Sequence, residues 1–130
     1  MLKNKRVLVF GTFDYLHPGH LFLLNEAVKQ GDDLFVVVAR DNNVKRIKGI
    51  QPTHNEQERV AAIQELDYVT DVRLGYEEWG MHLQVLEDIE PDVIVLGYDQ
   101  KARIPDGDWE IIRVEAFEPE KYKSSLLRNT

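Results

Sequence analysis

The order of elements near the N-terminus restricts the folds open to this chain. An apolar run from Arg6 to Phe10 has the composition of a strand that is covered on both faces of a sheet. Gly11 follows the run, and Pro18 suits the first turn of a helix, where its missing N–H is not needed. A helix start at a sheet edge presents unpaired N–H groups and a positive dipole end. This stretch therefore predicts a site for a phosphate or a nucleotide.

Apolar runs typical of strands alternate with stretches of helical periodicity along the rest of the chain. Further strands are expected at 34–39, 72–74, 93–96 and 110–114, helices at 18–30, 54–66, 81–89 and 123–128, and a polar loop at 40–52. Helices between successive strands imply a parallel sheet with right-handed crossovers. We therefore predict an α/β fold with one domain over residues 1–130, built on a Rossmann-like, doubly wound, parallel five-stranded sheet with helices on both faces.

The ends of several predicted elements carry further signals. Thr53 and Glu56 have the spacing of a capping box, which places the start of a helix directly after Thr53. Gly11, the polar loop after Ala39, and Gly97 all follow predicted strands. The carboxyl ends of parallel strands share one edge of a sheet, and ligands bind at that edge where the strand order reverses. We therefore expect these segments to meet at one ligand site.

Charge and composition exclude several classes of protein. The 130 residues carry a formal net charge of −7, whereas a general nucleic-acid binder is usually basic. Basic residues cluster in two patches, at 40–48 and 121–128, and two such patches in an acidic chain suit a small anionic ligand better than a long polyanion. The chain has no cysteine, which excludes disulfides, thiolate zinc sites and a cysteine nucleophile. No apolar run approaches the roughly 20 residues of a membrane span, so a cytoplasmic protein without a membrane partner is expected.

Two histidines at the predicted helix start are the leading candidates for chemistry. His17 and His20 lie three residues apart and can reach one ligand, and Gly19 between them allows a close approach to the backbone. Imidazole N–H groups can donate to phosphate oxygens as charge develops on them. Alternatively, one histidine caps the helix and the other packs in the core. A zinc site is a further alternative, with Asp14 as a third ligand.

Other candidate residues each have a functional and a structural interpretation. Thr12 and Phe13 could present backbone N–H groups to a ligand or form a simple turn, with Asp14 fixing the loop. Lys45 and Lys48 could fold over a phosphate or form a solvated face. Arg59 could lie at the ligand edge or pair with Glu56. Asp99 could contact a ribose or a base. Ser124 and Ser125 could cap a helix and also bind an anion there.

Two motifs resemble the signatures of a known family. Gly11-Thr12-Phe13-Asp14 followed by His17-Pro18-Gly19-His20 resembles the G-T-F-D and H-x-G-H signature of the cytidylyltransferase-like nucleotidyltransferases. Ser124-Ser125-Leu126-Leu127-Arg128 resembles their second signature, usually Ser/Thr-Ser-x-Ile-Arg. Arg59 stands where many members carry a helix arginine. Within the family, the segments 96–100 and 122–125 look most like the archaeal-type FAD synthases, although those often carry cysteines near the C-terminus.

The resemblance implies transfer of AMP from ATP to the phosphate of FMN, with release of pyrophosphate. It assigns phosphate binding and transition-state stabilisation to His17, His20, Lys45 or Lys48, and Arg128. It assigns nucleotide binding to the signature residues and to two later segments: Thr12, Phe13, His17, Pro18, Gly19, His20, Asp99, Tyr122, Ser124 and Ser125. Mg²⁺ would be carried by the nucleotide phosphates with few protein ligands. Family resemblance also suggests a homodimer, with the helix near Trp79 and Met81 at its interface.

Other functions stay open at this point. The same chemistry could use CTP and glycerol 3-phosphate or a similar small phosphorylated alcohol. A nucleotide-binding regulatory module without turnover is a different class, and a histidine metal hydrolase is a third.

Overall fold

A computed structural model of the chain describes residues 4–78, 81, 83–98, 100 and 104–115. Its strands form one sheet in the order β3-β2-β1-β4-β5, and each neighbouring pair is parallel. The strands are β1 (Arg6–Gly11), β2 (Asp33–Val38), β3 (Asp71–Leu74), β4 (Val93–Leu96) and β5 (Glu110–Arg113). All five coincide with predicted strands to within one residue at each end.

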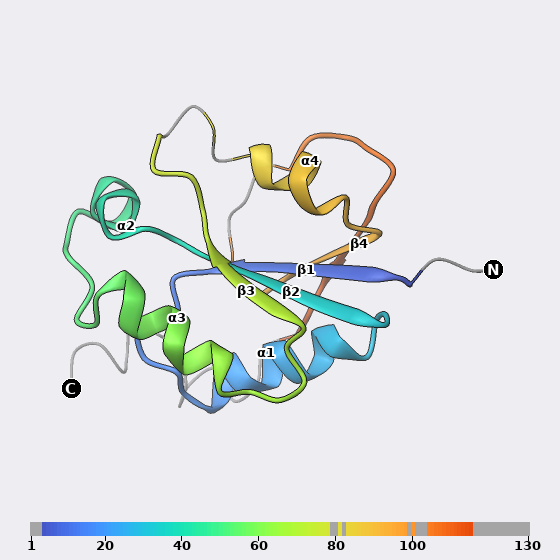
Figure 1. The fold of residues 1–130 in the computed structure, drawn as a ribbon, viewed down its shortest axis with the longest axis horizontal. Helices are drawn as coiled ribbons and strands as arrows, with labels where there is room; N and C mark the ends of the chain where they lie inside the picture. The colour runs from blue at the N-terminus through green and yellow to red at the C-terminus, as the bar shows by residue number, and fades with distance from the viewer. Residues whose placement is uncertain (1–3, 79–80, 82, 99, 101–103, 116–130) are drawn as a thin grey trace.

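Helices cover both faces of this sheet (Figure 1). The described helices are α1 (Pro18–Val28), α2 (Asp41–Lys48), α3 (Glu56–Gln64) and α4 (Gln84–Ile89). Leu24 of α1 and Ile63 of α3 share one buried cluster with Val7, whereas Leu86 of α4 packs with Leu8 on the opposite face. This confirms the doubly wound α/β fold. Among the described helices, none is long and apolar enough to cross a membrane.

The strand order reverses between β1 and β4, which lie side by side with Val9 paired to Val95. The chain builds the sheet from β1 to β3 in one direction and then crosses to β4 and β5 on the other side. A crevice outside the carboxyl ends of the strands at such a reversal is where ligands bind in open α/β sheets. The loop between β1 and α1, which ends at His17, begins at this point.

The prediction of a polar loop at 40–52 is wrong, because α2 occupies most of it. Asp41 lies in the first turn and the basic residues lie in the last turn, which complements the helix dipole. Gly49 ends the helix in the left-handed conformation, with a φ of 78°. Val44 is buried, but no second buried apolar residue of α2 repeats at helical spacing, so periodicity could not reveal this helix.

Two other helix boundaries differ from the prediction. α3 begins at Glu56, and its cap is Asn55, which forms a reciprocal capping box with Glu58 rather than the predicted box between Thr53 and Glu56. The helix predicted at 81–89 is described as α4 only from Gln84. The helix predicted at 123–128 lies outside the described residues.

Candidate nucleotide-binding site

The loop after β1 is held in a strained conformation by its own packing. Phe13 has a positive φ of 52° and its side chain is buried in the core. A β-carbon on Gly11 would come within 2.5 Å of the Phe13 ring, so only glycine fits there. Backbone strain of this kind persists where the surrounding structure enforces it, and it clusters at ligand sites. A ligand contact by Phe13 would therefore come from its backbone, as expected, and not from its ring.

His17 caps α1 through one of its two ring nitrogens. Its Nδ1 accepts a hydrogen bond of 3.1 Å from the backbone N–H of Gly19. An imidazole nitrogen that accepts cannot carry the proton, so the neutral ring carries it on Nε2. The capping role and the functional role were alternatives in the sequence, but the geometry makes them compatible. Burial lowers the pKa of His17, which favours this neutral form.

His20 lies against His17, with ring centroids 3.8 Å apart in a stacked arrangement. The edge of the Phe13 ring contacts the other side, at 5.3 Å between centroids. The pKa of His20 is lowered to about 4, chiefly by burial and also by the charges of His17 and Lys48, while a backbone hydrogen bond with Tyr15 opposes them. Both imidazoles are therefore neutral near pH 7 and can act as hydrogen-bond donors.

The lowered pKa of His20 predicts a dependence of stability on pH. The unfolded chain takes up this proton near pH 6.5, whereas the folded chain does so near pH 4. The contribution to stability is therefore complete above pH 6.5 and is lost as the pH falls toward 4. We expect the Tm of the wild type to fall by about 5 °C more than that of His20→Asn between pH 7.5 and 5. Parallel Tm curves from circular dichroism would contradict this expectation.

Asp14 fixes the loop after β1 to the start of α3. Its two carboxylate oxygens accept 2.8 Å hydrogen bonds from the backbone N–H groups of Thr53 and His54. The hydroxyl of Tyr15 lies 2.8 Å from Oγ1 of Thr53, and its ring meets that of His54 edge-on. This confirms that Asp14 fixes the loop, and it adds the partner segment that the sequence did not identify.

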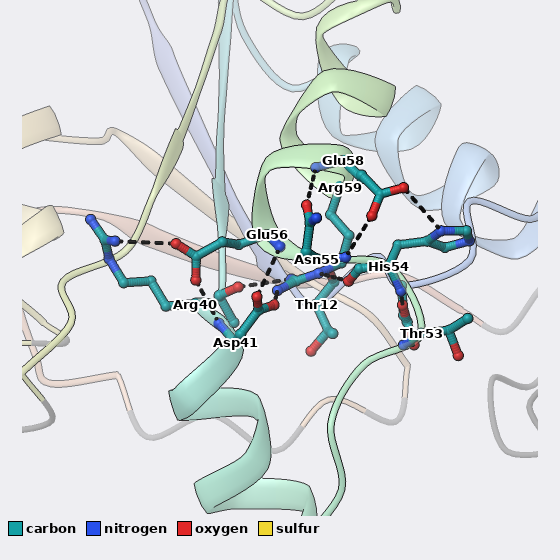
Figure 2. A network of polar contacts seen from close by, with 11 residues as sticks. Thr12, Arg40, Asp41, Thr53, His54, Asn55, Glu56, Glu58 and Arg59 are labelled. Atoms are coloured by element: carbon teal, nitrogen blue, oxygen red, sulfur yellow. Dashed lines mark hydrogen bonds and ion pairs between the residues drawn. The ribbon is translucent and has the colours of Figure 1, made fainter.

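Arg59 reaches the edge of the sheet where β1 and β2 end, as one of its two interpretations expected, but it does not pair with Glu56. Its side chain is fully buried, and its guanidinium donates to the carbonyls of Thr12, Ala39 and His54 at 2.8–3.0 Å (Figure 2). A further N–H group pairs with the carboxylate of Asp41 at 2.5 Å. One cation thus joins the signature loop, the end of β2, and the starts of α2 and α3. Its role is to position the site rather than to meet the ligand or pair with Glu56.

The starts of α2 and α3 meet and cap each other. The carboxylate of Glu56 accepts from the N–H of Asp41 at 2.9 Å, and that of Asp41 accepts from the N–H of Glu56 at 3.2 Å. Arg40 also pairs with Glu56, at 3.3 Å (Figure 2). With its acidic start fixed in this way, the basic end of α2 carries Lys48 close enough to lower the pKa of His20.

A third segment reaches the same edge from β4. Gln100 donates to the carbonyl of Phe10 at 3.1 Å and accepts from the N–H of Gly97 at the same distance. Arg113 of β5 donates to the carbonyls of Gly97 and Gln100 at 2.7 and 2.8 Å. The expected meeting of the Gly97 segment with the end of β1 is confirmed. Nothing in the spacing of Gln100 or Arg113 indicated these contacts.

The comparison of this chain with known families agrees with the geometry. A family model described as cytidylyltransferase-like matches residues 8–128. The chain belongs to the cytidylyltransferase-like family.

Several curated relatives carry the name FAD synthase. The FAD synthase of Aciduliprofundum boonei is 43% identical, over 96% of this chain and 85% of that protein. The FAD synthase of Methanosarcina barkeri is 44% identical, over 74% of this chain and 66% of that protein. The FAD synthase of Methanolacinia petrolearia is 36% identical, over 93% of this chain and 85% of that protein. The resemblance to archaeal-type FAD synthases is therefore confirmed.

Solved structures support the same architecture. The lipopolysaccharide core biosynthesis protein of Thermoplasma volcanium has a TM-score of 0.79 and 37% identity, covering 89% of this chain and all of that one. Pantoate-β-alanine ligase of Francisella tularensis, at 13% identity and a TM-score of 0.58, covers 98% of this chain and 69% of that one, and it shows the fold alone.

Several family residues lie outside the described part of the chain. They are Asp99, Tyr122, Ser124, Ser125 and Arg128, together with Trp79 of the suggested dimer contact. Their roles stay predictions. The zinc interpretation finds no support in the described residues, which hold no group of three or more histidine, aspartate or glutamate side chains suited to a metal. Asp14, its suggested third ligand, is occupied by two backbone N–H groups.

Proposed function

We propose that this chain is an FMN adenylyltransferase, which transfers AMP from ATP to FMN and releases pyrophosphate. The observation that carries the reaction type is the stacked pair of neutral histidines at the N-terminus of α1, beside the reversal of the strand order. The curated relatives named FAD synthase support FMN as the acceptor.

The chemistry requires two anions to be held together and in line. A phosphate oxygen of FMN attacks the α-phosphorus of ATP, the bond to the bridging oxygen of the β-phosphate breaks, and pyrophosphate leaves. Charge accumulates on the non-bridging oxygens of the α-phosphate. His17 donates to them through Nε2–H, and neutral His20 beside it acts as a second donor. No covalent nucleophile is needed.

Phosphate charge is balanced by the basic end of α2. Lys48 is the lysine whose charge reaches His20, so we assign it to the triphosphate, while Lys45 one turn earlier assists at longer range. The N-terminus of α1 adds the positive end of its dipole. Arg128 and the cap at Ser124 and Ser125 would complete the anion site as the family signature implies.

Mg²⁺ would accompany the nucleotide in this proposal. In nucleotide-dependent sites this ion is usually held by phosphate oxygens, waters and one or two carboxylates. Its contribution is to neutralise the phosphates. We expect EDTA to abolish turnover and added Mg²⁺ to restore it.

A matrix of substrates tests the proposal. ATP and CTP are each combined with FMN, glycerol 3-phosphate and phosphoethanolamine, and pyrophosphate release is measured for every pair. We expect turnover with ATP and FMN only. Turnover of a CTP pair with no reaction of ATP and FMN would identify a cytidylyltransferase instead. Tight ATP binding without pyrophosphate release from any pair would identify a regulatory module.

A further inference from the structure

Exposed apolar side chains occur on two segments that are linked to the signature loop. Among the described residues, large exposed apolar side chains are Tyr15, Ile47, Ile50, Met81 and Ile111. The first three belong to only two segments, the loop after β1 and the end of α2 with the residue that follows its cap. Ile47 is 63% exposed, although it is three residues after buried Val44 on the same helix.

Contacts near each end of the stretch from Lys48 to His54 connect it to the loop after β1 and to His20. Asp14 binds the N–H groups of residues 53 and 54, and Tyr15 binds the Thr53 hydroxyl. At the other end, the charge of Lys48 reaches His20. Ile50 lies between these two connections in the chain. It follows Gly49, where no atom lies within 4 Å of the position that a β-carbon would take. Tyr15, Ile47 and Ile50, which we call the apolar border, therefore lie on two segments that these contacts join next to the histidines.

Charge indicates what this border binds. Lys45, Arg46 and Lys48 alternate with the two isoleucines in a chain whose net charge is −7. Cations interleaved with exposed apolar groups suit a ligand that has a phosphate at one end and a large, flat, apolar ring system at the other. FMN has this constitution, with a flexible ribityl chain between its phosphate and its ring.

We propose that Tyr15, Ile47 and Ile50 bind the isoalloxazine ring of FMN while its phosphate lies toward Lys48 and His20. This inference rests on the proposed function. Aromatic stacking and apolar contact supply affinity for a planar ring without demanding hydrogen bonds. The border belongs to the acceptor and not to ATP, so its loss should affect FMN alone.

Binding of FMN, followed by the quenching of its own fluorescence, tests this assignment. We expect Tyr15→Ala and the double variant Ile47→Ser/Ile50→Ser each to raise the Kd and KM for FMN about tenfold, with the Kd for ATP unchanged. Tyr15→Phe keeps the ring, so it should bind FMN as the wild type does even though it loses the bond to Thr53. Ile111→Ser, at an equally exposed isoleucine of β5, is the matched control and should change neither value.

The outcomes separate this inference from the proposed function. If the wild type turns over FMN and the variants keep the wild-type Kd and KM for FMN, the assignment of the ring site is wrong. The proposed adenylyltransferase activity would then still hold. No binding or turnover of FMN by the wild type would overturn the function as well. A matching rise in the Kd for ATP would place the adenine there instead. Loss of a dimer in sedimentation, with FMN constants unchanged, would assign the border to a second copy of the chain.

Discussion

Replacing His20 by alanine is expected to slow turnover by about 10²–10³-fold, the effect of losing one transition-state donor. His20 stacks on His17 at 3.8 Å between ring centroids and is neutral near pH 7. In the proposed mechanism His20 donates to charge that exists only in the transition state, so its removal should lower kcat far more than it weakens ATP binding. The measurement is pyrophosphate release under saturating substrates, beside ATP binding by calorimetry.

The matched control for His20 is Asn25→Ala, at an exposed position of the same helix. It should leave kcat and ATP affinity unchanged, because its side chain lies on the solvent side of α1. An unchanged rate for His20→Ala would remove His20 from the mechanism. A rise in the Kd for ATP as large as the fall in kcat/KM would show that His20 binds the ground state rather than the transition state.

Much of the fold was predictable because its signals are local. The strands are short apolar runs, and α1 and α3 carry buried residues at helical spacing, such as Leu24 and Ala27. The order of strands and helices then implied the parallel, doubly wound sheet. α2 was missed because its stability comes from its ends: Asp41 and Glu56 cap each other across the starts of two helices, which no periodicity records.

Some features of the candidate site could likewise be predicted from the sequence, and others could not. The histidines were found from their spacing around Pro18 and Gly19, since three residues bring two side chains onto one helix face. Their stacking, the tautomer of His17 and the shift of the His20 pKa depend on burial, which the sequence does not show. The contacts of Gln100 join segments 90 residues apart in the chain and could be seen only in the fold.

Replacing Arg59 by alanine is expected to lower the free energy of unfolding by about 3 kcal/mol, the lower end of the cost of breaking a buried ion pair. The lower end applies because Asp41, its partner, is 30% exposed and can recover some hydration. Three carbonyls would lose a donor at the same time, those of Thr12, Ala39 and His54. Urea unfolding followed by circular dichroism measures the change.

Arg46→Ala, at an exposed position of α2, is the control and should change the free energy of unfolding by less than about 0.5 kcal/mol. Arg59→Lys should recover little, because one ammonium cannot reach acceptors that the planar guanidinium contacts from several directions. If Arg59→Lys restored full stability, charge alone would matter and the positioning role would be wrong. Since Arg59 holds both the signature loop and the start of α2, folded Arg59→Lys should also raise the KM for ATP, which loss of stability elsewhere would not do.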